Sequence, residues 1–187
     1  MSVIPIFCAI ALLVLLIATN GRIGSVFGSH LHRNLPGLKS AIISQGASDF
    51  SDVDRKLLTD YGITFPDDFG KNLQCYDSVN PLENKHPDYC TMHRRGTQLS
   101  ADAQFIKKWH KSSPELEAWM LQHGWKKVWN ENQPISEILD KPHNDTSIGV
   151  NYEKVRDGIT CTQTLMWIGP PTPNQLTPEQ ECVGSLR

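Results

Sequence analysis

The sequence predicts an α+β fold, in which an N-terminal transmembrane helix precedes one small disulfide-stabilised domain. That domain should contain a helical pair and an antiparallel hairpin or sheet. Three observations lead to this prediction: an uncharged apolar run at the start, helical spacing of apolar residues in the middle, and period-two alternation after residue 147. Because helical and strand patterns occupy separate stretches, α+β is favoured over α/β.

Length and composition restrict the chain to one domain and one appendage. Of 187 residues, 39% are hydrophobic and 20% charged, with a net charge of -2. A domain of about 150 residues buries enough surface to fold alone, so two cores are not expected. The charge is neither the excess of a disordered chain nor the basic balance of a nucleic-acid binder. We therefore expect no nucleic acid among the partners.

The apolar run extends from Val3 to Ala18 and, with the uncharged residues that follow, is just long enough to cross a bilayer. A signal peptide would require a basic segment before the run, and no basic residue precedes it. We expect residues 1–21 to be a transmembrane anchor or uncleaved signal, with the lipid bilayer as its partner. Cleavage after Gly21, or a buried hydrophobic helix covered by a partner, are the alternatives.

Two observations predict opposite orientations of the domain across the membrane. Arg22, Arg33 and Lys39 all follow the run, which by the positive-inside rule places the domain on the cytoplasmic side. Paired cysteines favour an oxidising exterior instead. The conflict disappears if the domain faces a side that is first topologically cytosolic and later exterior.

Five cysteines are present, and Cys8 lies within the apolar run. The remaining four allow three pairings, of which nearest-neighbour pairing is the simplest. They are Cys75, Cys90, Cys161 and Cys182. Asn144-Asp145-Thr146 is also a glycosylation sequon.

Residues 22–48 should form a stalk, since Gly, Ser and His are frequent and Pro36-Gly37 lies at the centre. The globular ectodomain is then 49–187. Its first element should be a short amphipathic helix from Ser51 to Tyr61, stopped by Gly62. The prolines between 64 and 96 exclude a long regular element there.

The helical pair is predicted at Ser100 to Lys111 and from Pro114 to Gly124, joined by Ser112-Ser113. Trp125 to Trp129 could be a strand, and Pro134 to Asp140 a short helix. The hairpin is the strongest pattern: Ser147 to Val155, a turn at Arg156-Asp157-Gly158, and Ile159 to Ile168. The remainder is expected to be extended or looped, with Cys182 able to pin it to the hairpin.

No pattern indicates catalysis or a cofactor. Metal half-sites are missing, because Cys90-x-x-His93 stands alone and no CxxC or HxxxH pair completes four ligands. No GxSxG nucleophile motif occurs either. We expect a protein that is not an enzyme and that carries no metal or cofactor.

All five tryptophans lie between residues 109 and 167, interleaved with lysines. Two interpretations remain open. The tryptophans form a core with lysines on the solvent face, or they form a surface for a partner or a membrane.

The order of several motifs resembles one family. Arg94-Arg95-Gly96-Thr97, then Ile106-Lys107-Lys108-x-x-Lys111-x-x-Pro114, then Ile159-Thr160-Cys161 and a final Cys182 resemble a small N-terminally anchored subunit of the poxvirus entry and fusion complex. The likeness covers scattered patches from residue 75 to 182.

The resemblance implies a single-pass virion membrane protein whose domain faces outward, holds two disulfide bonds and works with other membrane-protein subunits in membrane fusion. It implies that Arg94, Arg95, Gly96 and Thr97 form an exposed partner-binding loop. The alternatives are an accessory subunit of another membrane or capsid-membrane complex, and a secreted binding protein with a cleaved signal.

Overall fold

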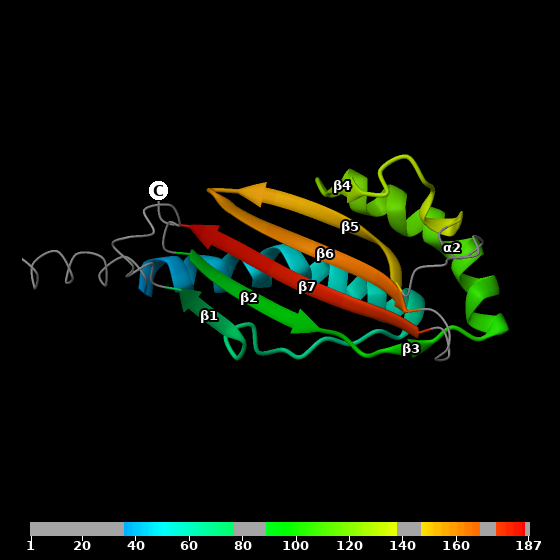
Figure 1. Cartoon of the computed structure of the whole chain (residues 1–187), viewed down its shortest axis with the longest axis horizontal. Coiled ribbons are helices and arrows are strands. Elements are labelled where there is room, and N and C mark those ends of the chain that lie inside the picture. The colour runs from blue at the N-terminus through cyan, green and yellow to red at the C-terminus, as the bar shows by residue number, and fades with distance from the viewer. Residues whose placement is uncertain (1–35, 77–88, 138–146, 169–174, 186–187) are drawn as a thin grey trace, which may run out of the picture. The chain divides into compact units, whose positions relative to one another are not determined.

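The computed structural model describes residues 36–76, 89–137, 147–168 and 175–185. Apart from the first two residues of its N-terminal helix, the described part belongs to the compact unit Leu38–Arg187. It has two layers: an antiparallel sheet and helices that pack on one face of that sheet (Figure 1). We call the face that contacts the helices the inner face and the opposite one the outer face.

The N-terminal helix covers residues 36–61 and begins earlier than expected. Its buried residues recur at helical spacing: Ile42, Gln45, Asp49, Phe50, Val53, Leu57 and Tyr61. Gly62, at φ 76°, ends it, and its N–H donates to the carbonyl of Leu58. The expected boundary between stalk and domain, at residue 49, therefore lies inside a helix that belongs to the core.

The sheet is built from seven strands of the described residues, in the order β1-β2-β7-β6-β5-β4, with β3 paired to β7. Every pairing is antiparallel. The strands are β1 (Leu73–Tyr76), β2 (Tyr89–Arg95), β3 (Leu99–Ser100), β4 (Lys126–Trp129), β5 (Ser147–Arg156), β6 (Ile159–Ile168) and β7 (Gln175–Ser185).

The predicted hairpin is confirmed as β5 and β6, which pair without interruption from Ser147 and Ile168 to Arg156 and Ile159. Asp157 and Gly158 join them at φ 51° and 78°. Two consecutive residues at positive φ are what a type I′ turn requires, and this turn matches the twist of the strands.

The helical pair is instead one helix, α2 (Ala103–Gln122), with Pro114 inside it. Asp102, not Ser100, caps it, accepting a 2.7 Å bond from the N–H of Phe105. Proline in a helix interior costs about 3 kcal/mol. Burial of Trp109, Leu116 and Met120 along one face of α2 offsets that cost, because breaking the helix at Pro114 would separate them.

Both helices pack on the inner face of the sheet. Gln45 of the N-terminal helix donates to the carbonyl of Ile159, and Trp109 of α2 lies edge-on against Trp167 of β6, with centroids 5.5 Å apart. The short helix expected over 134–140 is a 3-10 turn, η1 (Ile135–Glu137); residues 138–140 lie outside the described residues.

Two disulfides confirm the nearest-neighbour pairing. Cys75 bonds to Cys90 between β1 and β2, and Cys161 bonds to Cys182 between β6 and β7. Each joins residues directly opposite in register, with Cα atoms 4.0 Å apart. The second disulfide pins the C-terminal segment to the hairpin, as expected.

Within the described ranges, neither helix is long and apolar enough to cross a membrane. The anchor expected over residues 1–21, most of the stalk and the sequon at Asn144 lie outside those ranges.

Candidate partner-binding surface

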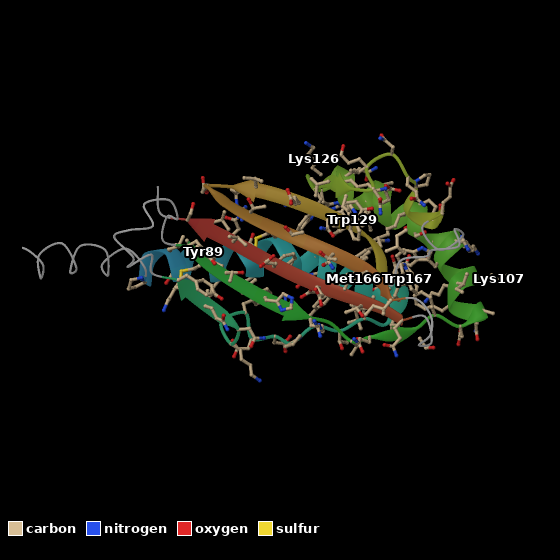
Figure 2. The ribbon with its side chains drawn as sticks, in the orientation of Figure 1. Tyr89, Lys107, Lys126, Trp129, Met166 and Trp167 are labelled. Atoms are coloured by element: carbon tan, nitrogen blue, oxygen red, sulfur yellow. A yellow bond between two sulfur atoms is a disulfide. The ribbon has the colours of Figure 1, made fainter. Side chains whose placement is uncertain are left out.

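Neither described helix covers the outer face of the sheet (Figure 1). Strand alternation decides which side chains reach it, since every second residue points away from the helices. It includes Tyr76, Tyr89, Thr91, His93, Arg95, Lys126, Trp129, Glu153, Val155, Thr160, Thr162, Thr164, Met166, Glu179, Glu181 and Val183. Figure 2 labels four of them, from β2, β4 and β6.

The centre of the outer face is ionic. Arg95 lies 2.7 Å from a carboxylate oxygen of Glu179, and His93 lies 3.6 Å from the other. Thr91 donates a 2.8 Å bond to Glu181. These are cross-strand contacts between β2 and β7, and such pairs stabilise neighbouring strands by about 0.2–1 kcal/mol.

The two ends of the outer face are apolar. At one end Tyr76 and Tyr89 stack with centroids 4.8 Å apart, and Val155 is 66% exposed. At the other end Trp129 lies over Gly149, where an added Cβ would come within 2.8 Å of the indole ring. Glycine at this position therefore allows the indole to lie flat on the sheet.

Exposed apolar residues are concentrated on this face. Of the five large hydrophobic side chains exposed in the described residues, three belong to it: Tyr76, Trp129 and Val155. Exposed apolar patches bordered by polar side chains mark interaction surfaces, and each apolar end of the outer face borders its polar centre.

The structure separates the four residues expected to form an exposed loop. Arg94 and Arg95 belong to strand β2, and Arg94 is buried, with 2% of its side chain exposed. Gly96 is also buried: its N–H donates to Pro178, and an added Cβ would lie 2.9 Å from that ring. The expectation of an exposed loop is therefore wrong at these two positions. Arg95 and Thr97 are exposed.

Arg94 is the centre of a buried polar network. Its guanidinium donates to a carboxylate oxygen of Asp54 at 3.1 Å, to the side chain of Gln180 at 2.8 Å, and to the carbonyl of Pro66. The ring of Phe69 lies 3.8 Å from its Cζ atom. All of these partners belong to the same domain. Arg94 therefore joins the N-terminal helix to the sheet and to the loop after that helix.

The pKa of Asp54 reflects its burial in this network. Burial raises the pKa of the Asp54 carboxyl, although hydrogen bonds from Gln180 and Arg94 act in the opposite direction. Burial therefore outweighs the two stabilising partners.

The tryptophans resolve the alternatives left open by the sequence. Trp109, Trp125 and Trp167 are at most 3% exposed, as a tryptophan core requires. Trp129 is 39% exposed and belongs to the outer face. Trp119 is partly exposed and stacks on His123, with centroids 4.0 Å apart.

The sequence did not point to the carboxylates of the outer face, because β7 was not predicted as a strand. A usable signal was present at 160, 162 and 164, where threonines alternate with buried residues. Threonines at every second position are typical of a half-exposed sheet face.

A hollow of about 410 Å³ lies between the N-terminal helix and α2. Its charged residues are occupied with one another: Lys56 contacts Asp60 at 3.1 Å and Glu115 at 3.0 Å, and the bond to Glu115 raises the pKa of Lys56. Among the described residues, no group of three or more His, Cys, Asp or Glu side chains could hold a metal ion.

No family model, curated protein or solved structure matches this chain.

Proposed function

We propose that this chain is a non-enzymatic, single-pass membrane protein, a subunit of a multi-protein complex that fuses viral and host membranes. The outer face of the sheet is its docking surface for another subunit. The family likeness supports the first statement. The second rests on the outer face, which neither described helix covers.

The chemistry of the outer face specifies the partner. Its carboxylates are Glu153, Glu179 and Glu181, and its permanent cations are Arg95 and Lys126. The centre is therefore slightly acidic, between two apolar ends. A complementary subunit presents basic side chains flanked by apolar ones, because complementary charge orients an interface while apolar anchors supply most of its affinity.

The disulfides support a domain that functions outside the reducing cytosol. Both are cross-strand and hold the sheet that forms the docking surface. A virion membrane with the domain facing outward fits that environment.

Site-specific photo-crosslinking in the assembled membrane tests the docking surface. A photoreactive residue at Thr162, in the middle of the outer face, should crosslink to another membrane subunit. The same residue at Arg55, on the exposed side of the N-terminal helix, should not. Equal crosslinking from both positions would contradict the proposal.

Two substitutions then test whether the contact matters. Glu181→Lys and Trp129→Ala should abolish co-purification of the crosslinked subunit and membrane fusion, while the melting temperature stays close to wild type. Asp52→Lys is the matched control for Glu181→Lys, since Asp52 is an exposed carboxylate on the N-terminal helix, where it pairs with the neighbouring Arg55. Folded outer-face variants that retain the subunit would sink the proposal.

A further inference from the structure

Three lysines form a stripe on the solvent side of α2, away from the outer face. Lys107, Lys108 and Lys111 are all exposed, and Figure 2 labels Lys107 on this helix. Their spacing of three and four residues places them side by side on one helical surface. We call them the lysine stripe.

The lysine stripe is not neutralised by the described part of the chain. None of its three ammonium groups forms an ion pair with a described carboxylate; Lys108 lies 5.7 Å from the ring of Tyr61. Glu115 is the acid best placed to neutralise Lys111, four residues along the helix. It pairs with Lys56 of the other helix instead.

The stripe lowers the stability of the helix that carries it. Like charges four residues apart, as at Lys107 and Lys111, destabilise a helix by about 0.2–0.5 kcal/mol per pair. The helix dipole does not stabilise the stripe either, because the dipole acts within the first and last turns and the stripe lies beyond the first turn. Folding therefore does not explain these lysines.

We propose that the lysine stripe binds the surface of an anionic lipid bilayer. The stripe is a convex row of mobile point charges, which matches the spread negative charge of many headgroups. Each lysine near such a surface contributes about 1 kcal/mol. Because α2 packs on the inner face of the sheet, lipid contact through the stripe leaves the outer face open to a protein.

Vesicle competition with the full chain tests this proposal. The protein is mixed with two differently labelled vesicle populations, phosphatidylcholine alone and phosphatidylcholine with phosphatidylserine, and its distribution is measured after flotation. Any binding through the apolar N-terminal run is common to both populations and to every variant. Wild type should prefer the phosphatidylserine vesicles at low salt, and the preference should fall as salt is raised.

A charge-matched pair of triple variants locates the effect. Lys107→Gln, Lys108→Gln and Lys111→Gln together should reduce the preference at least about tenfold. Lys39→Gln, Arg55→Gln and Lys71→Gln together remove the same charge from exposed positions elsewhere and should leave it intact. Circular dichroism checks that both variants are folded.

Two results would overturn the proposal. One is a wild-type protein that distributes evenly between the two populations. The other is an equal loss in the two triple variants, which would assign the preference to net charge. Neither result bears on the outer face, whose crosslinking is measured separately.

Discussion

Arg94 and Arg95 are neighbours in β2, yet their side chains have opposite environments. Arg94 faces inward and is 2% exposed, whereas 59% of the Arg95 side chain is exposed. Strand alternation alone produces this difference. The Arg-Arg motif by itself does not distinguish the two side chains. Their positions in the sheet do.

The two arginines should respond oppositely to substitution. Arg94→Met removes the cation beside Asp54 and the donor to the side-chain oxygen of Gln180, while the bond from Gln180 to Asp54 remains. We expect a loss of about 3 kcal/mol in the free energy of unfolding. Arg95→Met removes an exposed ion pair and should cost under about 1 kcal/mol. Urea titration with the disulfides intact measures both. Similar losses for the two would refute the assignment.

Asp54 makes stability depend on pH in a defined direction. Its pKa in the folded protein lies above its ordinary value of 3.8, so the folded state holds the proton more tightly than the unfolded state. That contribution to stability is fully present below pH 3.8 and is lost as the pH rises through the folded pKa.

Asp54→Asn should remove this contribution. The difference in unfolding free energy, wild type minus variant, is therefore expected to decrease from acidic to neutral pH. Urea titrations at a series of pH values give that difference directly. A difference that stays constant or grows with pH would show that the Asp54 pKa is not raised.

At the scale of elements, the two disulfides differ in accessibility. Cys161 and Cys182 are fully buried between central strands, while Cys75 is partly exposed on the edge strand β1. Edge elements open locally more often than central ones. Graded reduction under native conditions, with alkylation and peptide mapping, should label Cys75 and Cys90 before the central pair. Simultaneous labelling would mean that the sheet opens as one unit.

Gly149 is an element-scale test of the outer face. Gly149→Ala would place a Cβ 2.6 Å from the carbonyl oxygen of Leu165 and 2.8 Å from the Trp129 ring. We expect lower stability and a shift in tryptophan fluorescence as the indole is displaced. Gly37→Ala is the control, because nothing lies within 4 Å of its added Cβ. An unchanged spectrum for Gly149→Ala would contradict the described packing.

Strand β7 is a central strand that the sequence pattern did not predict. It contains Pro178, and proline normally excludes a central strand. Pro178 accepts a bond from Gly96 through its carbonyl, so its missing N–H points to the same side. On that side β2 has ended at Arg95 and β3 begins only at Leu99, so no ladder bond to β6 is lost.

At the scale of the whole molecule, the proposal predicts an intact mass. The natively expressed protein should retain residues 1–21 and gain the mass of four hydrogen atoms on reduction, two per disulfide. Mass spectrometry with and without reductant measures both quantities. Loss of about 21 N-terminal residues with an added glycan would instead indicate a secreted binding protein.

The sequence by itself determined the parts that depend on local chemistry. The hairpin turn and the period-two pattern of β5 and β6 follow from residues close in the chain. Nearest-neighbour pairing of the cysteines was the simplest of three pairings, and the structure selected it. The α+β class follows from the same patterns.

The extent of the helices, the burial of Arg94 and the outer face were decided only by the tertiary structure, because each depends on contacts between residues far apart in the chain. Burial beneath the sheet keeps the N-terminal helix continuous from residue 36 and α2 continuous through Pro114. Arg94 is internal because Asp54 and Gln180, distant from it in sequence, meet it in the core. The outer face exists because six strands bring alternate residues to one side, and no local pattern contains that arrangement.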